Sequence, residues 1–337
     1  MVKDEKSSDS VLDWLLEPDD PGVRYLALRD LAKADAVELA AAKKRAQASG
    51  PIAEVLSKMD KEGFWVRPGA GYNPKYFGTV WSVILLGQLG GSIDTDERIA
   101  TACAYILDHS LTKHGQFTAG GSPSGTIDCL QGNLCHALIE LGCTDPRLHE
   151  AYEYMARSVT GEGIAPATEK NATLRYYAGK CGPVFACSGT LGKPCAWGAV
   201  DVMLAFGKLH PAKRTSLIND AIKTGVDFLF SKDPARADYP LGFGSGGKPS
   251  GNWWKFGFPS FYVADILQIA EALARLGYGQ DHRLANALQI IRDKQDSRGR
   301  WLMEYDYTGK TWVDFGPKKQ PNKWVTLRAR RVLNLVK

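Results

Sequence analysis

The chain has 337 residues, of which 44% are hydrophobic and 23% charged, the balance of a globular protein. A net charge of +5, spread along the chain, is too small to indicate a nucleic-acid partner. No window approaches the roughly 18 apolar residues of a transmembrane helix, and the polar start of the chain lacks a secretory signal pattern. We therefore expect a cytoplasmic protein with no transmembrane segment and no nucleic-acid partner.

A helical unit recurs along the chain. In each copy a loop rich in Gly, Pro and aromatic residues leads into an apolar helix, and in four copies a short turn and an amphipathic helix follow. Because no segment alternates apolar and polar residues between hairpin turns, a sheet-based fold is not expected. The apolar helices are predicted at 23–34, 76–89, 128–141, 195–209, 260–276 and 323–336.

The two kinds of helix differ in their hydrophobic pattern. The first helix of a pair is apolar on most faces, as in AVDVMLAFG at 199–207, which indicates burial, whereas the second has one apolar stripe and is expected outside. About six such hairpins could form an open solenoid or a ring, and inner helices that are apolar nearly all round favour the ring. We predict an all-α ring in a single domain at 21–337, after an N-terminal extension at 1–20.

Two short motifs connect this pattern to a known family. Residues 295–301 (QDSRGRW) match the Q-x-x-x-G-x-W repeat of squalene–hopene cyclases, and 59–65 (MDKEGFW) is a degenerate copy. The chain also resembles a group of squalene-cyclase-like proteins of poorly defined activity, through PCAWGAV at 194–200. This resemblance implies the α/α toroid of terpene cyclases and protein prenyltransferase β subunits.

The motifs that would supply the chemistry of that family are not found. Class II cyclases protonate an alkene with the central Asp of D-x-D-D, and the nearest string, DTDE at 94–97, lies in a turn where Asp96 is predicted to cap a helix. The D-D-x-x-D metal motif is also absent from the sequence. The string GFGSGGKP at 242–249 differs from a phosphate loop at its last residue and is interpreted as a glycine loop. We therefore expect no class II cyclase activity.

The seven cysteines favour a metal site over disulfides, because their number is odd and no secretory signal is expected. Alignment of the repeats places Cys129 and Cys195 at the same register, in the first turn of neighbouring inner helices, where a thiolate is favoured. Cys187 lies in the loop that leads to Cys195. We predict zinc as the cofactor, bound by Cys129, Cys187 and Cys195, with Asp128 or Cys181 as a further ligand. The alternative is that these cysteines are small core residues.

The remaining cysteines, Cys103, Cys135 and Cys143, are expected to be structural.

Polar residues on the helix predicted at 128–141 are candidates for catalysis. Asn133 and His136 follow Cys129 on one helical face that should border the central cavity, and Asp128 begins that helix. The helical rise of 1.5 Å per residue places His136 about 10 Å from Cys129, too far for one metal ion. A hydrogen-bonded core histidine is the alternative for His136. The same register predicts an aromatic substrate-binding lining, formed by Tyr76, Trp81, Trp197, Tyr262, Asp265 and Trp324.

These residues lead to a functional hypothesis. A zinc-bound hydroxide would hydrolyse an ester or phosphoester bond of an apolar or aromatic small molecule in the cavity. One alternative is an isoprenoid transferase or cyclase, and another is a non-catalytic toroid with a structural zinc or no metal. Arg328, Arg330 and Arg331 are interpreted as a solvated helix face, with the alternative that one of them turns inward.

Overall fold

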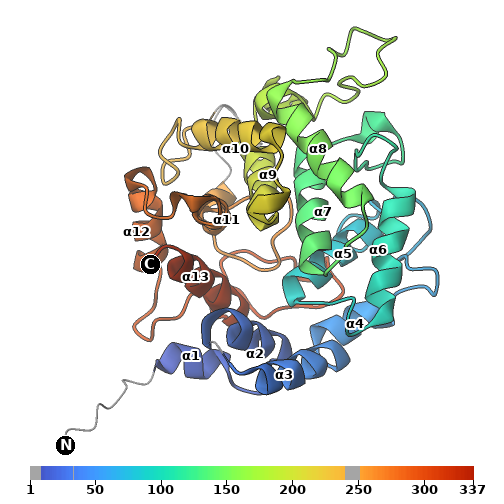
Figure 1. Cartoon of the computed structure of the whole chain (residues 1–337). Coiled ribbons are helices and arrows are strands. Elements are labelled where there is room, and N and C mark those ends of the chain that lie inside the picture. Colours follow the sequence, from blue (N-terminus) through green and yellow to red (C-terminus); the bar gives the residue numbers. More distant parts are fainter. Residues whose placement is uncertain (1–8, 33, 240–250) are drawn as a thin grey trace, which may run out of the picture.

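The computed structural model describes residues 9–32, 34–239 and 251–337 (Figure 1). The described ranges are mainly helical, as predicted, and their only sheet is a two-stranded antiparallel ladder of β1 (Ala186–Cys187) and β2 (Lys193–Pro194). The α-helices are α1 (Ser10–Leu15), α2 (Pro21–Ala27), α3 (Ala36–Ala48), α4 (Pro51–Ser57), α5 (Thr79–Leu89), α6 (Glu97–His109), α7 (Asp128–Glu140), α8 (Arg147–Thr160), α9 (Ala196–Lys208), α10 (Ser216–Leu229), α11 (Ile266–Leu273), α12 (Ala285–Asp293) and α13 (Lys323–Leu335).

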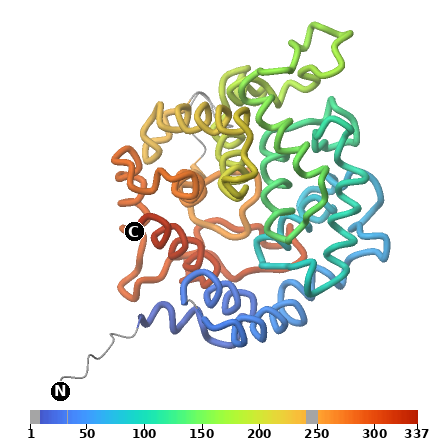
Figure 2. Tube along the Cα trace, in the orientation of Figure 1, coloured from blue at the N-terminus to red at the C-terminus, as the bar shows by residue number. Residues whose placement is uncertain are grey.

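The apolar helices pack side by side in chain order. Helix α5 packs against α7, α7 against α9, α9 against α11, and α11 against α13. Helix α13 packs against α2, and Gly90 at the end of α5 lies against Tyr25 and Leu26 of α2. The amphipathic helices α6, α8 and α10 lie outside these helices (Figures 1 and 2). The contacts therefore run from α5 through α7, α9, α11 and α13 to α2, which lies against the end of α5.

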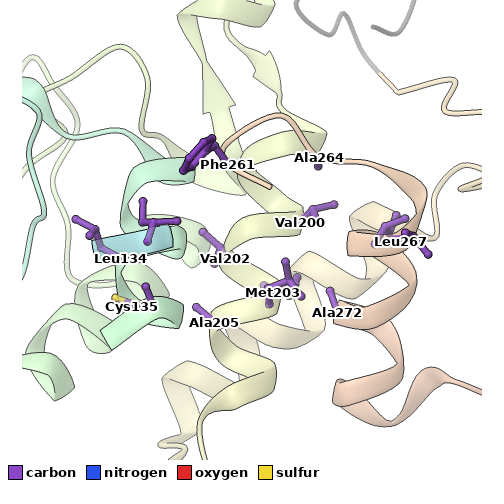
Figure 3. Packing of buried hydrophobic residues seen from close by; sticks show 14 of the residues in the cluster. Leu134, Cys135, Val200, Val202, Met203, Ala205, Phe261, Ala264, Leu267 and Ala272 are labelled. Atoms are coloured by element: carbon purple, nitrogen blue, oxygen red, sulfur yellow. The ribbon is translucent and has the colours of Figure 1, made fainter. Parts of the chain in front are cut away.

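The core lies where the middle inner helices meet. Leu134 on α7, Val202 and Met203 on α9, and Leu267 on α11 are at most 1% exposed (Figure 3). Cys135 is fully buried in the same cluster, as expected for a structural cysteine. Helix α1 adds to the hydrophobic core through Val11 and Leu15, so the described part of 1–20 packs on the helical domain.

The apolar helix predicted at 260–276 begins later than expected. The sequence pattern predicted a helix from 260, whereas α11 begins at Ile266. Asp265 caps this helix: its carboxylate accepts from the N–H of Gln268 at 2.9 Å, and the Gln268 side chain accepts from the N–H of Asp265 at 3.2 Å. Reciprocal capping fixes the first turn, so the apolar residues before Asp265 remain outside the helix.

The two motif copies form the same local structure. The indole N–H of Trp65 donates to the carbonyl oxygen of Val55 at 2.8 Å, and its backbone N–H donates to Thr79 at the start of α5 at 3.1 Å. Trp301 repeats this pattern at 2.7 and 3.0 Å, with Ile291 at the end of α12 and Thr326 on α13. Both tryptophans are fully buried. The motif therefore ties α4 to α5 and α12 to α13, so it connects a helix to the following inner helix in two separate repeats.

The four predicted outer helices are present. The first of them, α6, begins at the predicted cap. Asp96 is the N-cap of α6 and accepts from the N–H of Arg98 at 3.0 Å. We expect Asp96→Asn to lower the free energy of unfolding by at most about 1 kcal/mol, because Asn is also a good N-cap. Urea unfolding measures this change. A loss above about 2 kcal/mol would contradict a purely capping role.

No helix in the described ranges is both long and apolar enough to cross a membrane.

Candidate functional site

A cavity of about 220 Å³ lies beside the N-terminal ends of α7 and α9. We name it the cysteine cavity because three of its lining residues are the cysteines selected from the sequence. The loops that precede α5, α7, α9 and α11 all contribute to it. Its lining consists of Tyr72, Lys75, Ile127, Asp128, Cys129, Lys180, Cys187, Cys195, Trp197, Gly198 and Tyr262.

The β1–β2 ladder positions two of the thiols. Cys187 lies on β1, and Cys195 follows β2 and is the N-cap of α9. Their side chains are hydrogen-bonded to each other, which lowers the pKa of Cys187 to about 6, while the N–H groups of Gly189 and Thr190 act in the same direction. The same hydrogen bond and burial raise the pKa of Cys195. Cys187 is therefore the thiol of this pair that loses its proton first.

The third thiol, Cys129, has its pKa raised by burial and by the neighbouring carboxyl groups of Asp201 and Asp128.

Asp128 is a buried acid at the first position of α7, and its side chain is only partly satisfied. One carboxylate oxygen accepts a long hydrogen bond of 3.4 Å from Ser158, and the other is buried without a partner. Burial raises the pKa of Asp128 to about 7, and the nearby thiol of Cys187 acts in the same direction. Behind it, Cys181 contacts Ser158 at 2.9 Å and Tyr154 at 3.3 Å. Cys181 thus lies outside the lining of the cavity.

The predicted zinc ligands border one cavity but are not grouped as a metal site. Asp128, Cys129, Cys187 and Cys195 share one cavity, as the repeat register predicted. However, no three His, Cys, Asp or Glu side chains among the described residues are grouped in a way that could hold a metal ion. The four residues are therefore a donor set of suitable chemistry without the geometry of a metal site.

The predicted aromatic lining is present in part. Trp197 and Tyr262 border the cavity. Trp81, 2% exposed, lies behind them and donates from its indole N–H to the carbonyl oxygen of Tyr72 at 2.7 Å. Tyr76 stacks on Phe261, with ring centroids 5.1 Å apart.

The other two predicted lining residues lie away from this cavity. Trp324 stacks on Phe258, with ring centroids 4.6 Å apart. Asp265 forms an ion pair with Arg328 at 3.0 Å.

Asn133 and His136 border a second cavity, nearer the C-terminal ends of the inner helices. Asn133 donates to the carbonyl oxygen of Cys129 at 2.9 Å. His136 has a buried Nε2 atom without a hydrogen-bond partner, and burial lowers its pKa to about 3, with Lys208 and Arg275 acting in the same direction. His136 is therefore neutral near pH 7.

The pKa of His136 leads to a pH prediction. Because the folded pKa is below the unfolded value of about 6.5, the unfolded chain binds the extra proton, and stability falls as pH decreases below about 6.5. This loss amounts to at most about 1.4 kcal/mol of unfolding free energy per pH unit, and we expect it to be absent in His136→Gln. Urea unfolding between pH 7 and 4.5 measures it. The exposed His282, with 92% of its side chain accessible, is the control: a similar effect of His282→Gln would contradict the assignment.

Sequence reasoning missed three charged residues at or near the cysteine cavity. Lys75 donates to the hydroxyl of Tyr262 at 2.9 Å and lies 4.2 Å from the centroid of its ring, and Lys180 also borders the cavity. Asp201 on α9 is 1% exposed, and both of its carboxylate oxygens are buried without a hydrogen-bond partner, so burial raises its pKa well above the usual value. The signal for Asp201 was in the sequence, as the single acid in an apolar helix.

The glycine loop at 242–249 lies outside the described residues.

Comparison with known proteins adds little about this site. No family model matches the chain, and no curated protein matches it. It is similar to a solved structure of a protein from Actinoplanes, at 12% identity over 88% of this chain and 99% of that chain, with a TM-score of 0.31.

Proposed function

We propose that the protein is an enzyme whose active site is the cysteine cavity, and that it hydrolyses an ester-type bond of a small apolar or aromatic molecule. The observation that carries this proposal is the hydrogen-bonded thiol pair Cys187–Cys195, which borders the same cavity as the buried acid Asp128. Aromatic rings of Tyr72 and Tyr262 border the space that a substrate would occupy. A concave apolar site with few polar groups is typical of small-molecule binding.

The chain's own residues can carry out the reaction. The thiolate of Cys187 attacks the carbonyl carbon, a C–S bond forms, and the C–O bond to the alcohol breaks. The departing alkoxide takes a proton from Asp128, whose burial keeps part of its population protonated near neutral pH. Water then attacks the thioester and gives its proton to the Asp128 carboxylate. The acid product leaves, and Cys187 is again a thiolate.

A metal-dependent hydrolysis is the second candidate, favoured by the unpartnered Asp128 oxygen beside three thiols. In that reaction zinc would be held by Cys129, Cys187 and Cys195 and would supply a hydroxide at neutral pH. An isoprenoid reaction depends on the family resemblance alone.

Two variants separate the thiol and the metal reactions. With p-nitrophenyl acetate as the probe, Cys187→Ser should lower kcat/KM at least about 100-fold, and mass spectrometry should detect an acetyl group on Cys187 of the unmodified protein. Cys129→Ala should keep activity within about threefold, because Cys129 has no role in the thiol reaction. If the unmodified protein contains stoichiometric zinc and Cys129→Ala loses both the zinc and the activity, the metal reaction is favoured. Turnover of prenyl diphosphates but of no ester would contradict both.

A further inference from the structure

The second cavity, which we name the charged cavity, has a volume of about 80 Å³. It lies along the inner helices from the cysteine cavity toward their C-terminal ends: on α7, Asp128 and Cys129 border the cysteine cavity, and His136 and Glu140 border the charged one. Its cations come from four helical segments and are Arg29, Lys208, Arg275, Arg328 and Arg331.

The charges around this cavity do not balance. Four carboxylates face the five cations listed above. Asp30 pairs with Arg29 at 2.6 Å and also contacts Arg331. The others are Glu271, paired with Arg275 at 2.8 Å, Asp265, paired with Arg328, and Glu140, which contacts Lys208 and Arg29. Burial lowers the pKa of Lys208 to about 7, and the nearby Arg275 acts in the same direction. Because His136 is neutral near pH 7, one positive charge remains without a carboxylate in this network whenever Lys208 is protonated, and a bound anion would favour that protonated form.

Two nitrogen atoms around the cavity also have no partner. The Nε atom of Arg331 and the Nε2 atom of His136 are both buried without a hydrogen bond, although both side chains border the cavity. A buried donor without an acceptor destabilises a fold by about 1–3 kcal/mol. His136 is a donor in the tautomer that carries its hydrogen on Nε2. A hydrogen-bond acceptor in the cavity would satisfy both nitrogen atoms and remove this destabilisation.

Helix ends explain only part of this arrangement. The C-terminal ends of helices carry partial negative charge, which favours Lys and Arg nearby. That effect accounts for cations such as Lys208, the last residue of α9. It does not account for the unpartnered donors, because compensation of a helix dipole requires no specific hydrogen bond to Arg331 or His136.

We propose that the charged cavity binds a small oxyanion, of the phosphate or carboxylate class. Its oxygen atoms would accept from Arg331 and His136 and would lie between the cations Arg275 and Lys208. Oxyanions accept several charge-assisted hydrogen bonds at once, and arginine is the side chain best suited to donate them. This site is separate from the cysteine cavity and does not depend on the reaction proposed there.

The test is binding of inorganic phosphate, and separately of acetate, to the full-length protein. Thermal unfolding and isothermal titration calorimetry are compared with sodium chloride at matched ionic strength. An anion that binds the folded state raises the melting temperature as its concentration increases. Phosphate binding assigns the site to a phosphate group, and binding of acetate alone assigns it to a carboxylate. If neither anion has an effect beyond that of chloride, the proposal is overturned.

Variants locate the binding. Arg275→Gln should weaken anion binding about tenfold, because it removes one charge-assisted contact. Arg331→Lys keeps the charge beside Asp30 but removes the Nε donor, and it should weaken binding similarly even if Arg275→Gln does not fold. Arg236 belongs to a surface ion pair and its side chain is 75% exposed, so Arg236→Gln should leave anion binding unchanged. Unchanged affinity in both cavity variants, or equal weakening by Arg236→Gln, overturns the proposal.

Discussion

Replacement of Asp265 by alanine is expected to lower the free energy of unfolding by about 4–6 kcal/mol. Its carboxylate binds the guanidinium of Arg328 through two contacts of 3.0 Å, and the side chains are only 8% and 11% exposed. Loss of one partner leaves the other charge buried, which destabilises by about 3–5 kcal/mol. Loss of the N-cap of α11 adds about 1 kcal/mol. Since whole domains are stable by about 5–15 kcal/mol, the variant should unfold at low urea concentration.

Two further variants separate the contributions of Asp265. Asp265→Asn keeps an N-cap and removes the charge, so it should lose most of the stabilisation from the ion pair and keep the stabilisation from the cap. The double variant Asp265→Ala/Arg328→Met should be more stable than Asp265→Ala, because it removes the unpaired buried charge. Urea unfolding of the unmodified protein, Asp265→Ala, Arg328→Met and the double variant provides a double-mutant cycle. A loss below about 1.5 kcal/mol in Asp265→Ala would mean that water already solvates this pair.

The helical architecture was predictable because its signals are local. Apolar residues on most faces identified inner helices such as α5 and α9, and a single stripe identified outer ones such as α10. The boundary of α11 was not predictable from hydrophobicity, because apolar residues continue on both sides of the Asp265 cap. Local pattern thus determines which segments are helical, and capping determines where they begin.

The site was predictable only where the repeat register holds. Cys129 is the second residue of α7 and Cys195 is the N-cap of α9, so alignment placed both thiols at helix starts that border one cavity. The tyrosines precede their helices on loops of different length and shape. The register therefore selected Tyr76, whereas Tyr72 borders the cavity. Side chains on loops need the tertiary structure for their placement.

The charged cavity was hidden for a different physical reason. A helix with arginines on one face has the same pattern whether that face meets water or a buried set of carboxylates. Arg328 and Arg331 were interpreted as solvated, but their side chains are 11% and 18% exposed and pair with Asp265 and Asp30. Their carboxylate partners are distant in sequence. That interpretation was wrong, and only the packing of α13 against its neighbours corrects it.

Replacement of Gly132 by alanine is the second large effect that we expect. Gly132 lies in the middle of α7, where this helix packs closely on α9. An added Cβ atom would lie 2.6 Å from the backbone nitrogen of Val202 and closer still to the backbone of Asp201. Such a contact is well inside the normal distance, and neither helix backbone can move without repacking the core. We expect a loss of about 3 kcal/mol, even though alanine favours a helix by about 1 kcal/mol relative to glycine.

A second helical glycine provides the matched control. At Gly225 on α10, an added Cβ would come within 2.5 Å of the sulfur and terminal carbon of Met203. These atoms are the far end of a flexible side chain that can change rotamer, so the clash is relieved at small cost. We expect Gly225→Ala to change the free energy of unfolding by less than about 1 kcal/mol, because the gain in helix propensity offsets the adjustment of Met203. Urea unfolding of both variants measures the difference. Equal losses would mean that α7 and α9 can move apart as easily as the Met203 side chain changes rotamer. The close backbone approach at Gly132 would then not be what holds these two helices together.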